Sequence, residues 1–222
     1  LIDKKVEKDE AIFQVLKKYI IASKRIRFEG NGYGDEWKAE AKKRGLSNHK
    51  TTPAALKAKV SKKALDLFKD LNVMNHVEVE ARYEIELEEY TKKIQIEGRV
   101  LGDIARNHVI PTAITYQNTL IANVKGLKDI FGNEFEKYAS EQINLIREIS
   151  GHISTIISTV DKMTDERKKA NKIDHADKKA DAYCKNVKPL FDKIRYACDK
   201  LELLIDDELW PLTKYRELLF VR

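Results

Sequence analysis

The sequence has few of the residues that interrupt helices, and it has almost no cysteine. Its 222 residues include four prolines, nine glycines and two cysteines. Proline and glycine are the least favourable residues in helix interiors, so their scarcity leaves room for long helices. Cys184 and Cys198 lie on one predicted helix, and a rise of 1.5 Å per residue places them roughly 21 Å apart. That distance excludes a disulfide between them, and two free thiols indicate a reducing cytoplasm.

Long apolar runs are missing as well, whereas charge of both signs is abundant. Charged residues make up 35% of the chain, with 42 Lys and Arg against 36 Asp and Glu. One segment without charge, residues 107–124 (NHVIPTAITYQNTLIANV), contains too many amides and hydroxyls for a lipid bilayer. We therefore expect no contact with a membrane, and we expect this segment to be buried on all sides at the centre of the protein.

Three runs of apolar residues at alternating spacings of three and four predict long helices that pack nearly antiparallel. The runs span about residues 83–108, 135–163 and 176–204, and the first includes His108 in register. Pro111 and Pro189 fall within helical segments and predict kinks. Shorter helices precede these runs, and no segment has the pattern of a strand. The sequence thus predicts an all-α fold, an antiparallel bundle of long helices with short helices at the N-terminal side.

A glycine-rich stretch, EGNGYGDEW at residues 29–37, is a candidate phosphate-binding loop. Such a loop needs a strand before the glycines and a helix whose first amides face the phosphate. Here the preceding residues have a helical pattern, the third glycine of GxGxxG is missing, and no Gly-Lys-Ser/Thr follows. We interpret the stretch as a turn, with Trp37 anchoring the helix that follows.

Acidic residues do not form a metal-binding pattern. Glu80, Glu84 and Glu88 share one helical face, but a di-iron bundle needs Glu-x-x-His pairs on two helices, and the chain has none. Glu148 and His152 form a single pair at helical spacing. We interpret the glutamates as a solvated face and expect no metal ligands.

Nucleophiles and basic clusters also lack the pattern of a site. Neither cysteine has a basic motif that would mark it as reactive, and His108 fits a hydrogen-bonded core histidine. The basic residues 167–169 and 178–179 flank a predicted hairpin tip, with acids interleaved and no aromatic side chain that could stack on bases. We therefore expect no catalytic residue, no cofactor-binding residue and no binding of nucleic acid.

The C-terminal tail is unusually apolar. Seven large apolar side chains lie between Leu209 and Phe220, and an exposed tail of this kind would associate with other surfaces. We expect a turn near Trp210 and a short helix, about Thr213 to Phe220, that packs on the protein itself.

Several long strings resemble the late part of type III glutamine synthetase, the large-subunit bacterial form. They are FEGNGYGDEW, AKKRGLSNHKTTPAAL, the stretch from RYEIELEEYTKK to NVKGLKDI, and the closing LWPLTKYRELLF. The resemblance extends over essentially the whole chain. Gly34 and Thr213 depart from the family, where Ser and Pro are expected, and neither position bears on chemistry.

The resemblance implies that the chain is the C-terminal end of a longer enzyme. The family makes glutamine from glutamate, ammonia and ATP, with Mg or Mn ions held by glutamates that lie upstream. None of its ATP, metal or substrate motifs occurs here, so the family's functional residues transfer to no position of this sequence. Residues 1–45 resemble the end of the catalytic domain, and residues 46–222 resemble the family's extra C-terminal helical-bundle domain.

Two functions remain open at this point. In the first, the chain is a structural part of glutamine synthetase, whose partners are the rest of that polypeptide and the other subunits of a ring homo-oligomer. In the second, it is a stand-alone helical-bundle interaction protein.

Overall fold

A computed structural model describes residues 6–220, and across this range the chain is helical and has no strand. The all-α expectation is therefore confirmed. Contacts divide the chain into two units, Leu1–Lys50 and Thr51–Arg222.

The first unit contains two α-helices joined by the glycine-rich turn. Its elements are α1 (Lys8–Ala22), η2 (Lys24–Ile26) and α2 (Asp35–Lys43). Phe28, just before the glycines, packs on Trp37 of α2 with the ring centroids 4.7 Å apart. A Cβ atom at Gly30 would lie 2.8 Å from the Phe28 ring, so this position requires glycine to keep the pair in contact. Trp37 anchors the helix after the turn, as the sequence predicted.

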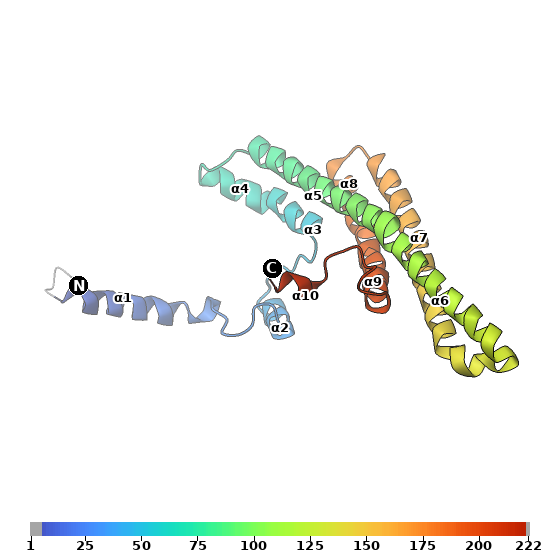
Figure 1. Cartoon of the computed structure of the whole chain (residues 1–222). Helices are drawn as coiled ribbons and strands as arrows, with labels where there is room; N and C mark the ends of the chain where they lie inside the picture. The colour runs from blue at the N-terminus through green and yellow to red at the C-terminus, as the bar shows by residue number, and fades with distance from the viewer. Residues whose placement is uncertain (1–5, 221–222) are drawn as a thin grey trace. The chain divides into compact units, whose positions relative to one another are not determined.

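The second unit is built from three long helical rods. The first rod runs continuously through α5, η4 and α6, the second rod is α7, and the third rod is α8, η6 and α9 (Figure 1). The second rod packs against α6 and against α9, whereas α8 packs against α5. The bounds are α3 (Thr52–Lys57), η3 (Ala58–Val60), α4 (Lys62–Asp70), α5 (His76–Ile104), η4 (Ala105–Val109), α6 (Ile110–Phe131), η5 (Gly132–Glu134), α7 (Phe135–Asn171), α8 (Ala176–Ala182), η6 (Tyr183–Val187), α9 (Pro189–Leu204) and α10 (Tyr215–Leu218).

The two prolines inside the rods each follow a π turn. The Ile110 amide donates to the carbonyl of Ala105, and the Lys188 amide donates to that of Tyr183, in each case five residues back. Proline has no N–H to donate and crowds the carbonyl four residues before it, so the preceding turn widens by one residue. The chain accommodates Pro111 and Pro189 by these π turns, which are a known cause of helix bending.

The core of the second unit lies where the second and third rods meet. Tyr183, Ile149, Ile156, Ile194 and Leu201 are among its largest fully buried side chains. All belong to the apolar runs that predicted these helices, so the predicted contact stripes of α7 and of the third rod are confirmed. Burying one such aliphatic side chain contributes about 1.5–3 kcal/mol.

The first rod departs from the prediction. Of residues 107–124 only Val109, Ile110 and Ala113 are buried, and half of the segment is exposed on the second unit, so the expectation that it forms the centre is wrong. The physical reason is that α6 packs mainly against a single helix, α7, and an absence of charge does not show how many neighbours a helix has. No helix within residues 6–220 is long and apolar enough to cross a membrane.

The predicted packing of the C-terminal tail on the core is confirmed only for the first residues of the tail. Trp210 is half-buried against the core, and the Lys214 Nζ donates to the carbonyl oxygen of Glu202 at 3.0 Å. Leu218 and Phe220, by contrast, are exposed, so packing of the whole tail on the protein is not observed. The side chain of Tyr215, which the prediction also included, lies outside the described residues.

Candidate functional site

The acidic residues singled out in the sequence stay apart. Glu80, Glu84 and Glu88 are exposed, and Glu88 pairs with Lys92 at 3.4 Å. His152 Nε2 lies 3.8 Å from the Glu148 carboxylate. In the described part of the chain, no three acidic, histidine or cysteine side chains gather where they could hold a metal ion.

Both cysteines are half-buried thiols without a disulfide partner. Burial raises the pKa of Cys198 to about 11, so this thiol stays protonated near neutral pH and is a poor nucleophile. Burial, together with a hydrogen bond to Cys184, raises the pKa of the Tyr90 hydroxyl.

His108 is exposed rather than part of the core, which corrects the prediction. It lies in the π turn η4, whose additional residue rotates it off the helical register of the first run.

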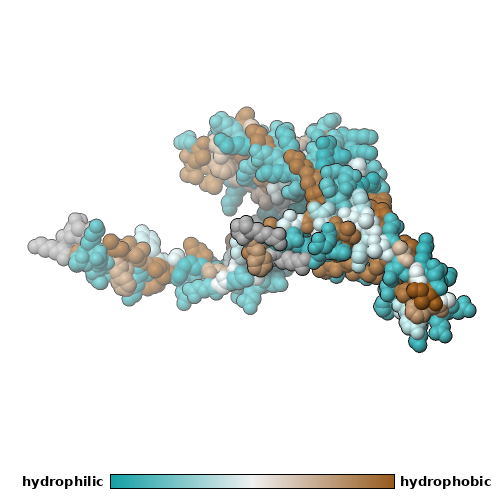
Figure 2. Space-filling view, in the orientation of Figure 1, coloured by the Kyte–Doolittle hydropathy of each residue, from teal (hydrophilic) through white to brown (hydrophobic). Residues whose placement is uncertain are grey.

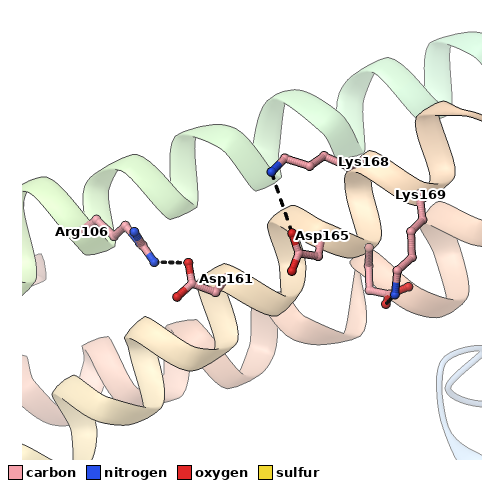
Figure 3. A network of polar contacts seen from close by, with 6 residues as sticks. Arg106, Asp161, Asp165, Lys168 and Lys169 are labelled. Atoms are coloured by element: carbon pink, nitrogen blue, oxygen red, sulfur yellow. Dashed lines mark hydrogen bonds and ion pairs between the residues drawn. The ribbon is translucent and has the colours of Figure 1, made fainter.

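The basic cluster at residues 167–169 is largely neutralised by its own helix. Lys168 pairs with Asp165 at 3.9 Å (Figure 3), and Lys169 pairs with Glu166 at 2.7 Å. These pairs join residues three positions apart on α7, as is common on solvated helices. Arg167 is the exception in this cluster, because its side chain points toward a groove between α5 and α7.

That groove is the candidate site. It has a volume of about 330 Å³ and lies where α5 passes into η4, facing the C-terminal half of α7. Arg106 reaches across from η4 to form an ion pair with Asp161 of α7 (Figure 3). The residues that line the groove are Gly98, Arg99, Gly102, Asp103, Arg106, Asn107, Val160, Asp161, Met163, Thr164 and Arg167.

The floor of the groove is close-packed and apolar. A Cβ atom at Gly98 would lie 3.2 Å from the ring of Phe191, and one at Gly102 would lie 3.3 Å from the Met163 methyl carbon. Together with Val160, these residues leave little room beneath the groove. The glycines therefore let α5 approach the other rods closely, and the open space lies above them, among the charged side chains.

The charges of the groove are not evenly paired. Asp161 binds Arg106, and Asp103 accepts a hydrogen bond from the Asn107 amide. Among the described residues, Arg99 and Arg167 have neither an ion pair nor a hydrogen-bond partner. Arg167 is half-buried nonetheless, and a guanidinium that is partly removed from water is stabilised by an anionic partner.

The two unpaired arginines act on the same buried group. Burial raises the pKa of the Tyr183 hydroxyl, while the positive charges of Arg167 and Arg99 and a hydrogen bond to Asn171 act to lower it. That hydrogen bond, from the Tyr183 hydroxyl to the Asn171 side-chain oxygen, is 2.6 Å long. Both guanidinium groups are thus within electrostatic reach of the Tyr183 hydroxyl.

Sequence reasoning did not find this groove. Arg99 and Arg106 were not singled out, and Arg167 was assigned to a solvated basic cluster. The glycine pair Gly98 and Gly102, four residues apart on a helix, was the available signal, because small residues at this spacing let helices approach closely. The spacing of these glycines does not show which helix packs against them.

Comparisons with known proteins agree with the resemblance in the sequence. Residues 11–128 match the family described as "Glutamine synthetase C-terminal domain". Over 223 aligned residues the chain is 47% identical to a protein of Bacteroides fragilis named "Glutamine synthetase", with all of the chain and 31% of that protein covered. It is 30% identical to "Type-3 glutamine synthetase" of Dictyostelium discoideum, again over the whole chain and 30% of the relative. A "Glutamine synthetase" of Butyrivibrio fibrisolvens is 29% identical over 96% of the chain and 30% of the relative.

The chain therefore spans less than a third of the length of the curated relatives that it matches. The part that they share with it is their C-terminal part. The family match covers more than half of the chain and continues from the first unit into the second. The chain belongs to the glutamine synthetase C-terminal domain family.

Proposed function

We propose that this chain is the C-terminal helical region of a glutamine synthetase, and that its own role is structural rather than catalytic. The observation that carries the proposal is the 47% identity to a glutamine synthetase over the whole chain but only 31% of that relative. The complete enzyme would form glutamine from glutamate, ammonia and ATP. Its ATP and Mg or Mn sites would lie upstream of these residues, which contain none of the corresponding motifs.

Residues 1–45 would complete the catalytic domain, and residues 46–222 would form the helical bundle attached to it. The surface of α1 supports this division. Phe13, Leu16, Tyr19, Ile20 and Ile21 are all more than half exposed, and apolar surface runs along α1 (Figure 2). A helix that is apolar around most of its circumference is normally buried in a larger core. We assign that core to the preceding part of the polypeptide.

The partners of the region would be the rest of the enzyme and the neighbouring subunits of a ring homo-oligomer. The compartment would be the cytoplasm, which suits Cys184 and Cys198 as free thiols. Neither nucleic acid nor a membrane is required as a partner.

Two polypeptides test the proposal when they are assayed side by side for ATP-dependent γ-glutamyl hydroxamate formation. One is the product of the complete reading frame, and the other is the 222-residue chain. We expect activity from the complete polypeptide only. A reading frame that starts close to Leu1, or a complete product without activity, would instead support a stand-alone helical-bundle interaction protein.

The proposed burial of α1 has its own test in the complete polypeptide. Leu16→Asp would place a charge in the catalytic core, so activity or soluble yield should fall at least tenfold. Gln14→Asp introduces the same charge on the same helix at an exposed polar position and serves as the control. Equal behaviour of the two variants would show that α1 is not buried.

A further inference from the structure

We propose that the groove between α5 and α7 binds a small oxyanion, a phosphate or a carboxylate group, between the guanidinium groups of Arg99 and Arg167. This inference is independent of the proposed enzyme function, because it depends only on the second unit. The groove, at about 330 Å³, lies at the small end of the range of ligand pockets.

The first step in the argument is that the nearby acids are already engaged. Asp161 binds Arg106, Asp165 binds Lys168, and Glu166 binds Lys169 (Figure 3). Asp103 lies one helical turn after Arg99, at the spacing that favours an ion pair, but its carboxylate accepts from Asn107 instead. None of these carboxylates pairs with Arg99 or Arg167, and the groove lining carries three arginines against two aspartates, which leaves it net positive.

The second step is that two cations remain without a partner at one place. Arg99 projects from α5 and Arg167 from α7, and both line the groove. No described residue forms an ion pair with either of them. Because arginine presents several N–H donors in a fixed plane, two guanidinium groups that line one groove suit an oxyanion that accepts from both.

The third step concerns what holds the groove open. Arg106 crosses from η4 to α7 and is fixed by Asp161, which forms one end of the site. Arg106 and Asn107 both lie in the π turn and line the groove, and π turns are frequent at functional positions in helices. Beneath them, Met163 is almost fully buried, so its methyl group reports on the floor of the groove.

Methionine-methyl NMR tests the proposal on the unmodified 222-residue chain. The chain has two methionines, so a sample labelled at the methyl carbon gives one signal from the groove, Met163, and one internal reference, Met74. Sodium phosphate and sodium succinate are titrated separately, against sodium chloride at equal ionic strength. We expect the Met163 signal to shift in a saturable manner while the Met74 signal does not move.

The two titrations also identify the chemistry of the ligand. Saturation by phosphate alone indicates a phosphate-bearing ligand, saturation by succinate alone indicates a carboxylate, and saturation by both indicates a site for small oxyanions generally. If neither anion shifts Met163 beyond the chloride control, the proposal is wrong.

Substitutions then assign the binding to the two arginines. Arg99→Gln and Arg167→Gln should each weaken the affinity for the bound anion about tenfold, the effect of losing one charge-assisted hydrogen bond. Arg82→Gln is the matched control, because Arg82 is another exposed arginine of α5 with no ion pair to a described residue. Affinities that are equal in the Arg99, Arg167 and Arg82 variants would overturn the assignment.

Discussion

Gln117 of α6 donates its side-chain amide to the hydroxyl of Ser150 on α7 at 2.6 Å, and to the carbonyl oxygen of Ile146 at 3.0 Å. These bonds cross the interface of a helix pair whose other side is exposed. They show how the charge-free segment of α6, which is not buried at the centre of the second unit, is nevertheless held to its neighbour.

The first prediction follows from this contact. Gln117→Ala removes both cross-helix bonds, which should lower the free energy of unfolding by about 1 kcal/mol and the melting temperature by about 2–4 °C. Asn118→Ala is the control, because Asn118 is exposed and makes no hydrogen bond with a described side chain or backbone group. Differential scanning calorimetry measures both variants. A Gln117 variant as stable as the Asn118 variant would show that the contact does not stabilise the pair.

Two glycines should respond to substitution in opposite directions. Gly98→Val places branched carbon atoms against Phe191, which a Cβ alone would already meet at 3.2 Å, so overpacking should destabilise the chain by about 1–3 kcal/mol. Nothing lies within 4 Å of a Cβ at Gly126 in α6, and Gly126→Ala should stabilise it by about 1 kcal/mol through helix propensity. Urea unfolding monitored by circular dichroism gives both values. The same sign for the two substitutions would contradict this account of the groove floor.

Trp210 should carry most of the stabilisation that the tail provides. Trp210→Ala removes an indole that is half-buried against the core and should lower the melting temperature by about 2–4 °C. Trp210→Phe should retain most of the stability, because the buried indole N–H has no hydrogen-bond partner among the described residues. Leu218 is 68% exposed, so Leu218→Ala should have no effect. The melting temperatures are measured on dilute monomer, so that a loss of stability reflects contacts of the tail within the chain. Unchanged melting temperatures would mean that the tail is ordered only against another subunit.

The raised pKa of Cys198 predicts a loss of stability in alkaline solution. Its ordinary value of 9.0 rises to about 11 in the folded chain because the thiol is buried. Between these values the unfolded chain releases a proton that the folded chain retains, so stability decreases as the pH rises from about 9 to 11. Cys198→Ala should lose less stability over this window than the unmodified chain, as urea unfolding at pH 8 and pH 10 would show. Parallel pH profiles would mean that the folded environment does not shift this thiol.

The sequence was sufficient to predict the long helices because their apolar residues are large and evenly spaced. Ile149 and Ile156 of α7, and Ile194 and Leu201 of α9, lie in the core as their spacing indicates. Trp37 likewise packs against Phe28 and anchors the helix that follows the glycine turn. In these places the local pattern and the packing agree.

The same reasoning failed along the first rod for two physical reasons. Between Ile94 and the π turn its buried residues are the glycines Gly98 and Gly102, followed by Ala105 at the start of the turn, and small residues give a weak periodic signal. The π turn then changes the phase, which removed His108 from the predicted core. The unpaired arginines of the groove were missed because pairing depends on which helix lies opposite, and a single sequence does not show this.

The π turn of the first rod also lets one continuous helix serve two sets of neighbours. One additional residue rotates everything after it by about 100° relative to everything before it. Before the turn, α5 packs mainly on α3, α4 and α8 and has fewer contacts with α7 and α9, whereas after the turn α6 packs mainly on α7. Deleting a single residue from η4 would therefore turn the wrong side of α6 toward α7, although its composition would hardly change. The number of residues in η4 therefore determines which face of α5 and which face of α6 packs against the neighbouring helices.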